Sequence, residues 1–427
     1  MEPARPWPEG PPPCSQRRVN ILFIHQNMPG QFRHLIHHFA TAAQHRVVCI
    51  GRRRDFAPPG VGRVTYQLPD SALPAANPFL TPLDTAVRHG LQVARSCNAL
   101  VANGFRPDLI VAHPGWGESL YVKEVFPDVP LLHYCEFYYR THGADVNFDP
   151  EDQQDLSANC VTRTRNAHLL LALENCDWGI SPTPWQRQQH PQAYQDKISV
   201  RFDGIDTNAA CPDAAARFVL PDGRILQPGD PVVTYVARGL EPYRGFPSFM
   251  RSLPEILRRL PDARIVVVGG DEVSYGKAPR DGRTWREVMC EEVTVDPARV
   301  HFLGRLSYAD YLRLLRVSAA HVYLTVPFVL SWSMLEAMAA GCVVIGSATP
   351  PVQEVIEDGK NGFLVDFFSP AMIADRVVDA VQQRLPVAEV RQAARWTALS
   401  RYSLDRCLPR QIEVLSAVAA GRRPEPD

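Results

Sequence analysis

Residues 19–40 read VNILFIHQNMPGQFRHLIHHFA, an apolar run followed by a turn and an amphipathic segment. The run Val19–His25 predicts a strand. Apolar residues at the i, i+3, i+4 and i+7 spacing predict a helix over Gln31–Ala40. When short apolar runs and amphipathic segments alternate in this way, the strands form a parallel sheet with helices packed on its faces.

The same alternation continues along the chain and is interrupted once. Before the interruption, we expect further strands at Arg46–Ile50, Leu109–His113, Leu131–Tyr134, Trp178–Ser181 and Ile198–Phe202. After a polar, turn-forming stretch that ends near Asp230, we expect strands at Val232–Val236, Arg264–Val268, Val300–Leu303, His321–Leu324 and Cys342–Ile345. Helices are expected near Phe246–Leu260, Ala309–Val317, Ser333–Ala340 and Pro370–Gln383. The predicted fold class is α/β, with two Rossmann-like doubly wound domains facing a central cleft.

The length of 427 residues suits two domains of ordinary size. We predict a disordered, proline-rich tail at residues 1–18 and an N-terminal Rossmann-like domain at 19–208. A linker is expected at 209–230 and a C-terminal Rossmann-like domain at 231–400. Residues 401–427 are expected to form a C-terminal helix, which packs back towards the N-terminal domain, and a tail.

Charge and cysteine content exclude several classes of protein. Lys+Arg 45 and Asp+Glu 46 leave a net charge of -1, so there is no overall basic field to attract nucleic acid. The 10 cysteines are scattered singly, without a C-x-x-C pair, which predicts reduced thiols and a cytoplasmic location. The first residues lack the apolar run of a signal peptide. Polar residues and Gly341 interrupt Leu324–Gly346, which we interpret as strand, loop, helix and strand rather than a membrane span.

No common catalytic signature is present. The chain has no G-x-x-x-x-G-K-[ST] phosphate loop, G-x-G-x-x-G turn, G-x-S-x-G elbow or H-E-x-x-H helix. It also lacks a strict D-x-D triplet that would hold a divalent metal on a diphosphate. We therefore expect no metal and no resident cofactor, and any bound diphosphate must be neutralised by arginine or lysine.

The best candidate cations are Arg238 and Arg244, which follow the first predicted strand of the second domain. Arg244 immediately precedes Gly245 and the next helix, so both guanidinium groups can converge on phosphate oxygens beside a helix N-terminus. Two such charges would stabilise the negative charge on a departing diphosphate. The alternative is a pair of surface arginines that bond carbonyl groups or Glu241.

A second candidate anion-binding site is the loop Val326–Ser333, which leads into the N-terminus of another predicted helix. Glu336 is acidic in an otherwise apolar helix and can accept hydrogen bonds from paired ribose hydroxyls. Its alternative role is structural, because Ser333-x-x-Glu336 has the spacing of a capping box.

The order of these motifs resembles the donor domain of family 4 retaining glycosyltransferases, which have the GT-B fold. The matching segments are Arg238, Arg244-Gly245, Val267-Val268-Gly269-Gly270, Val300–Gly304, Leu335–Ala339 and Asn361–Val365. In the first domain, Ser181–Gln186, Ile198–Val200 and Asp203–Thr207 resemble the end of that family's acceptor domain. The resemblance extends from Val19 to about Leu415.

The resemblance implies roles for residues on the donor side. Arg238 and Arg244 would act catalytically by holding the donor diphosphate without a metal, and Glu336 would bind the ribose. The remaining donor-binding residues would be Gly30, Phe302, Leu303, Ser331, Trp332 and Ser333. Two positions depart from the family pattern. Arg244 stands where lysine is common, and Phe328 stands where a glutamate that contacts the sugar is common, which leaves the donor sugar open.

On the acceptor side, His133 is the nearest positional match to a family histidine that lies close to the reacting sugar. His113 competes for this role, and Glu136 is a candidate contact for an acceptor hydroxyl. For each of the three, a structural role is an open alternative. The short basic run Arg52-Arg53-Arg54 would favour peripheral contact with a membrane if the acceptor were lipid-linked.

The resemblance implies an enzyme that moves a sugar from a nucleotide diphosphate-sugar to a glycan, a lipid-linked molecule or another hydroxyl acceptor. Retention of configuration would follow from a front-face mechanism in which the donor phosphate helps to deprotonate the acceptor. Two alternatives remain. One is a non-catalytic member of the same architecture that binds nucleotide or glycan, suggested by Phe328, and the other is a sugar-nucleotide epimerase.

Overall fold

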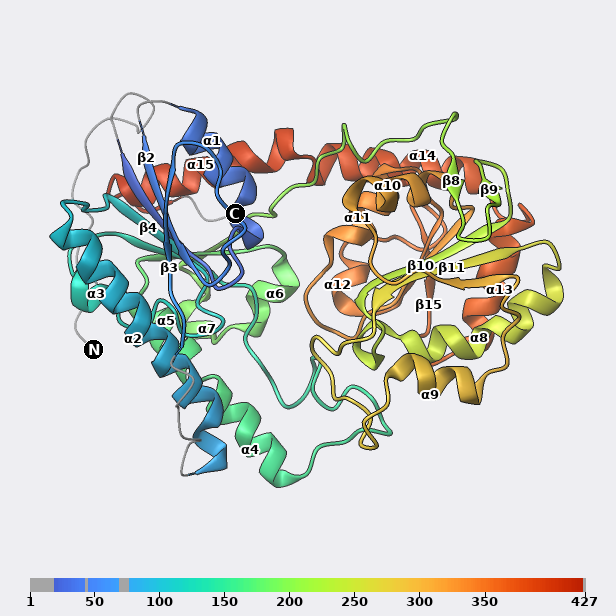
Figure 1. Ribbon diagram of the computed structural model, residues 1–427, viewed down its shortest axis with the longest axis horizontal. Coiled ribbons are helices and arrows are strands. Elements are labelled where there is room, and N and C mark those ends of the chain that lie inside the picture. The colour runs from blue at the N-terminus through green and yellow to red at the C-terminus, as the bar shows by residue number, and fades with distance from the viewer. Residues whose placement is uncertain (1–18, 43–44, 69–76, 425–427) are drawn as a thin grey trace. The chain divides into compact units, whose positions relative to one another are not determined.

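The computed structural model describes residues 19–42, 45–68 and 77–424 (Figure 1). The expected tail at residues 1–18 lies outside the described residues. The chain divides into two compact units: Met1–Asp203 with Cys407–Asp427, and Gly204–Arg406. Each unit contains its own parallel β-sheet with helices around it, which confirms the predicted α/β class with two doubly wound, Rossmann-like domains.

The first unit contains a seven-stranded parallel sheet of order β3-β2-β1-β4-β5-β6-β7. The strands are β1 Asn20–Ile24, β2 Arg46–Gly51, β3 Val61–Thr65, β4 Leu109–Ala112, β5 Leu131–Tyr134, β6 Trp178–Ser181 and β7 Ile198–Val200. The order reverses between β1 and β4, which are paired neighbours. Such a switch point leaves a ligand-binding crevice at the carboxyl ends of the strands.

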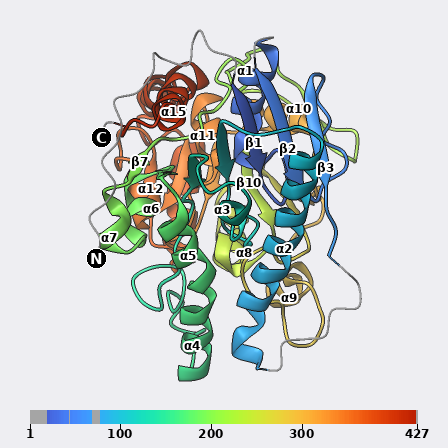
Figure 2. The same ribbon diagram turned by 90° about the vertical axis from the view of Figure 1, so that its left-hand side faces the viewer.

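Helices cover both faces of this sheet. They are α1 Arg33–Thr41, α2 Thr81–Ala102, α3 Val122–Val125, α4 Leu156–Arg165, α5 Ala167–Asn175, α6 Pro184–Gln189, α7 Gln192–Gln195 and α15 Leu404–Ala419. The apolar stripe of α1 packs into one core cluster with Val414, Leu415 and Val418 of α15. On the opposite face, Val93 and Cys97 of α2 pack against β1 and β4. Figure 2 shows α2 and α5, which contact each other on this second face.

The second unit contains a six-stranded parallel sheet of order β12-β11-β10-β13-β14-β15, with its switch point between β10 and β13. Its strands are β10 Val232–Gly239, β11 Arg264–Gly270, β12 Val300–Phe302, β13 Ala320–Tyr323, β14 Val344–Ser347 and β15 Phe363–Val365. Its helices are α8 Phe246–Arg259, α9 Trp285–Glu292, α10 Tyr308–Val317, α11 Trp332–Ala339, α12 Pro350–Gln353, α13 Pro370–Val381 and α14 Val387–Thr397. The segment Leu324–Gly346 forms the loop after β13, then α11 and most of β14.

The segment 209–230, which we expected to be a linker, is instead part of the second unit. It contains a small antiparallel hairpin of β8 Phe218–Val219 and β9 Ile225–Leu226. Phe218 and Leu226 are buried in one core cluster with Val232 and Leu314, so the polar turns of this stretch carry apolar residues that pack on the sheet. Residues from Cys407 onward belong to the first unit.

Among the described residues, no helix is long and apolar enough to cross a membrane.

Candidate functional site

Arg238 and Arg244 lie at the carboxyl end of β10, on the switch-point side of the second sheet. Arg238 is exposed and forms no ion pair or hydrogen bond with the described part of the chain. Arg244 donates from Nη1 to Thr325 Oγ1 at 2.8 Å, and its guanidinium lies 5.3 Å from the centroid of the Tyr275 ring. Among the described residues, neither guanidinium bonds Glu241 or a carbonyl group, and both retain donors that can bind an anion.

Gly245 determines how Arg244 reaches this position. It has φ +65°, and a Cβ here would lie 2.5 Å from Leu324 Cβ, so only glycine allows the turn to pack on the end of β13. The turn is the short 3-10 segment Pro242–Arg244, whose last carbonyl accepts a hydrogen bond from the Tyr235 hydroxyl at 2.6 Å. Arg244 is thereby placed beside Thr325, the second residue after β13.

The second predicted anion site is the N-terminus of α11. Ser331 is its N-cap, with Oγ accepting a hydrogen bond from the Ser333 backbone N–H at 3.3 Å. The Ser331 backbone N–H donates in turn to the Tyr323 hydroxyl at 3.0 Å. Because the helix begins at Trp332, Glu336 lies more than a turn inside it. The capping-box alternative for Ser333 and Glu336 is therefore wrong.

Glu336 is instead held by two tyrosines of α10. Its carboxylate accepts from the Tyr308 hydroxyl at 2.9 Å and from the Tyr311 hydroxyl at 3.0 Å, one on each oxygen. Burial, together with the Glu336 charge, raises the pKa of Tyr311 well above its ordinary value, so this hydroxyl remains a donor. A carboxylate oxygen can accept more than one hydrogen bond, so the Glu336 carboxylate suits a ligand with two neighbouring hydroxyls.

Phe302 and Leu303 lie at the carboxyl end of β12, the edge strand of the second sheet, and both are half-buried. The Arg286 guanidinium lies 6.0 Å from the Phe302 ring centroid and donates to Asp271 at 2.7 Å. This arrangement leaves a partly apolar edge next to a cation, at the same end of the sheet as Arg238.

Phe328 is buried and packs against two tyrosines. Its ring centroid lies 5.9 Å from that of Tyr243 and 5.1 Å from that of Tyr275. An aromatic cluster of Tyr243, Tyr275 and Phe328 therefore stands beside Arg244.

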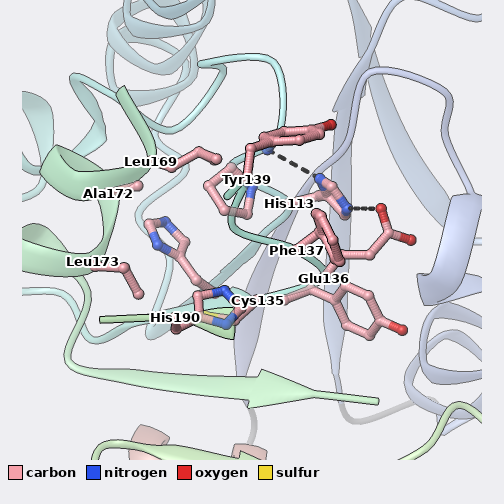
Figure 3. A pocket seen from close by; sticks show the side chains of 13 residues that line it. His113, Cys135, Glu136, Phe137, Tyr139, Leu169, Ala172, Leu173 and His190 are labelled. Atoms are coloured by element: carbon pink, nitrogen blue, oxygen red, sulfur yellow. Dashed lines mark hydrogen bonds and ion pairs between the residues drawn. The ribbon is translucent and has the colours of Figure 1, made fainter. Parts of the chain in front are cut away.

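In the first unit, the switch point brings together side chains from the ends of β1, β4 and β5. His25 Nε2 lies 2.8 Å from Gln31 Oε1, and Gln31 Nε2 donates to Glu136 Oε1 at 2.6 Å. His113 Nε2 lies 3.3 Å from Glu136 Oε2. Figure 3 shows His113 directed at this carboxylate. The four side chains form a continuous hydrogen-bonded chain from His25 to His113.

Backbone amides select the tautomers of both histidines. The Asn27 N–H points to His25 Nδ1 at 2.9 Å, and the Gly115 N–H points to His113 Nδ1 at 3.1 Å. Each Nδ1 is therefore the acceptor, and each Nε2 carries the proton that it donates along the chain. Burial is the main cause that lowers the pKa of His25 to about 3, with a smaller contribution from the neighbouring His113, so the His25 ring is neutral at physiological pH.

Gly30 lies very close to the His25 side chain, which belongs to the same loop. It has φ +50°, and a Cβ at this position would lie 2.3 Å from His25 Nε2. Glycine here leaves room for the His25–Gln31 hydrogen bond.

His133 lines a small cavity together with His113 and Glu136, so the structure brings the three predicted residues together. Figure 3 labels His113 and Glu136 in this cavity. The cavity is about 40 Å³, room for a few water molecules. His133 is fully buried, and burial lowers its pKa to about 3.

Several residues of the two sites were not anticipated from the sequence. His25 and Gln31 flank the predicted glycine turn, and the position of His25 directly after a strand was a usable signal. The Tyr308 and Tyr311 hydroxyls bond Glu336, on a helix that begins more than 20 residues later in the chain. Nothing in the local sequence pattern indicates these hydrogen bonds. Within the described residues, no group of three or more His, Cys, Asp or Glu side chains is placed to hold a metal.

Solved structures share this two-unit architecture. A sucrose-phosphate synthase from Thermosynechococcus elongatus aligns with a TM-score of 0.65 at 19% identity, covering 92% of this chain and 97% of that one. Anabaena HepE, solved in complex with UDP-glucose, aligns with a TM-score of 0.64 at 18% identity, covering 93% and 100%. The fold is thus GT-B, the class built from two Rossmann-like domains in one chain.

Two family models match consecutive parts of the chain: "Glycosyl transferase family 4 group" over residues 43–210 and "Glycosyl transferases group 1" over residues 230–383. The chain belongs to this family 4, group 1 set of glycosyltransferases. A D-inositol 3-phosphate glycosyltransferase of Nocardioides sp. is 27% identical, over 58% of this chain and 56% of the relative. A GDP-mannose-dependent phosphatidylinositol monomannoside mannosyltransferase of Mycolicibacterium smegmatis is 29% identical, over 52% and 55%. The chain spans about half the length of these curated relatives.

Proposed function

We propose that the protein is a glycosyltransferase that moves a sugar from a nucleotide diphosphate-sugar to a hydroxyl acceptor. The observation that carries this proposal is the pair Arg238 and Arg244, which has no carboxylate partner among the described residues and stands at the switch point of the second sheet. Family membership supports the same activity.

In this proposal, Arg238 and Arg244 bind the diphosphate and stabilise its charge as the bond to the sugar breaks. The start of α11, at Ser331, Trp332 and Ser333, contributes the partial positive charge of the helix dipole. Glu336 accepts hydrogen bonds from the two ribose hydroxyls. Phe302 and Leu303 contact the base, and Gly30 belongs to the loop that approaches the donor phosphates. The arginines take the place of a metal, and no resident cofactor is needed.

On the acceptor side, we assign the polar contact to Glu136 and His113, whose Nε2–H bonds that carboxylate. His133 is fully buried, so we place it behind these two residues as a neutral, supporting group. The chemistry that we propose retains the anomeric configuration. The acceptor oxygen forms a bond to the anomeric carbon, the bond to the diphosphate breaks, and the acceptor proton passes to a donor phosphate oxygen.

The relatives suggest where to look for substrates. UDP-glucose was bound by HepE, and GDP-mannose is named for the mycobacterial mannosyltransferase, so both are donors to try. Two relatives are named for inositol-containing acceptors, which favours a polyol or a lipid-linked polyol as the acceptor class. We further propose a cytoplasmic enzyme that contacts a membrane surface when its acceptor is lipid-linked.

The test is release of nucleoside diphosphate from UDP-glucose and GDP-mannose in the presence of polyol acceptors. Arg244→Ala is expected to lower turnover by roughly a hundredfold, since it removes a charge that stabilises the leaving group. Arg251→Ala is the matched control, because Arg251 forms a surface ion pair with Glu292. Unchanged turnover in a folded Arg244→Ala protein contradicts the diphosphate assignment. Conversion of the donor without any acceptor would instead favour the epimerase alternative, and binding without turnover the non-catalytic one.

A further inference from the structure

Glu241 lies between Arg238 and Arg244 in the chain, and its fully buried carboxylate bonds neither of their guanidinium groups. It accepts instead from three consecutive backbone N–H groups of the loop after β11: Ser274 at 3.3 Å, Tyr275 at 3.1 Å and Gly276 at 2.8 Å. Its own carbonyl accepts from the Arg244 backbone N–H at 3.1 Å. One residue therefore joins the arginine turn to a loop more than 30 residues further along the chain.

Burial of the Glu241 carboxylate is by itself energetically unfavourable. Removing a carboxylate from water carries a large penalty, which hydrogen bonds from several N–H groups offset only when the geometry is maintained. The loop is also held sterically. A Cβ at Gly276 would lie 3.3 Å from Glu241 Oε2, and a Cβ at Gly239 would lie 2.3 Å from the Glu272 carbonyl oxygen. The loop backbone is thus pressed against the end of β10.

These contacts position Tyr275, the central residue of the three that bond Glu241. Its ring faces the Arg244 guanidinium at 5.3 Å and contacts Phe328, with 5.1 Å between ring centroids. Arg244 is held on two sides, by this ring and by the Thr325 hydroxyl at 2.8 Å. An arginine side chain restrained in this way loses less conformational freedom when it binds an anion.

We propose that Glu241 is a positioning residue for the anion site: by gathering the N–H groups of 274–276, it holds the Tyr275 ring against Arg244 and sets the direction of the guanidinium. This inference rests on the proposed function, because it takes the ligand of Arg244 to be a diphosphate. Glu241 acts through Tyr275, and Phe328 also packs against the Tyr275 ring.

The test compares binding of UDP with UMP, and of GDP with GMP, by calorimetry on the full-length protein. Wild type is expected to bind one diphosphate more tightly than its monophosphate. Tyr275→Leu removes the aromatic face from a side chain that is 42% exposed, so the fold is kept. We expect it to weaken diphosphate binding by roughly three- to tenfold and to leave monophosphate binding unchanged. Tyr275→Phe keeps the ring and should restore wild-type affinity.

Glu241→Gln is the second variant to be measured in the same binding experiment. It leaves one oxygen to accept and replaces the other by a donor, so the loop N–H groups lose part of their partner and diphosphate affinity should fall at least as far as in Tyr275→Leu. Glu292→Gln, at an exposed ion pair, is the matched control. In an Arg244→Ala background, Tyr275→Leu and Glu241→Gln should have no further effect, because both act through Arg244.

The outcomes separate this inference from the proposed function. If wild type binds neither diphosphate, the proposed function and the inference both fail. If wild type binds a diphosphate and Tyr275→Leu binds it as tightly, the inference alone is overturned. Equal losses for diphosphate and monophosphate, or a Tyr275→Phe protein as weak as Tyr275→Leu, also overturn it, since both would indicate general damage to the fold.

Discussion

At the residue scale, two glycines determine where the polar side chains of the two sites can stand. Gly245 allows the arginine turn to lie on Leu324, and Gly30 leaves space for the His25 ring. Both have positive φ, so any side chain at either position meets a backbone penalty as well as a collision. A missing Cβ is therefore part of the geometry of each site.

Gly30→Ala tests this in the first unit. We expect a loss of about 1–3 kcal/mol in the free energy of unfolding, because the new Cβ would lie 2.3 Å from His25 Nε2 and would disrupt the His25–Gln31 hydrogen bond. Gly104→Ala is the control. Gly104 also has positive φ, but nothing lies within 4 Å of its Cβ position. Denaturant unfolding measures both, and equal losses would show that the collision with His25 contributes nothing.

At the element scale, the position at which α11 begins decides what Glu336 can do. A start at Trp332 with Ser331 as N-cap places Glu336 inside the helix, where it faces Tyr308 and Tyr311 of α10. A start two residues later would have made the same carboxylate a capping group. A shift of the helix start by half a turn therefore decides whether Glu336 can bind a ligand or caps the helix.

Substitution of the two serines distinguishes these starts. Ser331→Ala is expected to destabilise the second unit by about 1 kcal/mol, the usual loss when an N-cap side chain is removed. Ser333→Ala should cost much less, because the Ser333 hydroxyl bonds only the Ser331 hydroxyl, at 2.9 Å, among the described residues. Urea unfolding of the two variants measures the difference. A larger loss in unfolding free energy for Ser333→Ala than for Ser331→Ala would instead support the capping-box role of Ser333 and Glu336.

At the scale of the whole molecule, buried neutral histidines are unevenly shared between the units. Burial lowers the pKa of His25 and His133 to about 3 and of His89 and His190 to about 4, all in the first unit. In the second unit, burial lowers the pKa of His321 to about 4. In the unfolded chain these rings titrate near 6.5, so acid protonates the unfolded state first.

We therefore predict that the first unit loses more stability than the second between pH 7.5 and pH 5.5. A lowered histidine pKa contributes stability that is complete above pH 6.5 and is lost as the pH falls towards 3 or 4, at up to about 1.4 kcal/mol per pH unit and group. Hydrogen exchange of the amides in β1 and β4, compared with β10 and β13, measures the two units separately. Greater loss of protection in β10 and β13 would contradict the prediction.

Glu118 supplies the control for this experiment. Burial raises its pKa, so its contribution has the opposite sign and stabilises the first unit as the pH falls. Glu118→Gln removes this opposing contribution, so the loss of protection in β1 and β4 should become larger at the pH at which the folded-state Glu118 carboxyl takes up its proton. A smaller loss would mean that the carboxyl group, and not the histidines, dominates.

The strands of both sheets were predictable because central parallel strands are buried on two faces and appear as unbroken apolar runs. Two edge strands were missed: β3, since Val61–Thr65 is largely exposed and contains no such run, and β15, since Phe363–Val365 is only three residues long. Helix α2, Thr81–Ala102, was also missed. The stretch 209–230 was mistaken for a linker because its turns are polar, although Phe218 and Leu226 pack into the core.

The amino-acid sequence by itself determined the α/β class, the recurrence of strand and helix, and the candidates Arg238, Arg244 and Glu336, since each depends on residues close together in the chain. Only the tertiary structure decided which partners these groups have. Contacts such as Tyr275 with Arg244 or Gln31 with Glu136 join residues 31 or 105 positions apart. Parallel strands gather the ends of distant segments at one edge of a sheet, and no local periodicity records which side chains meet there.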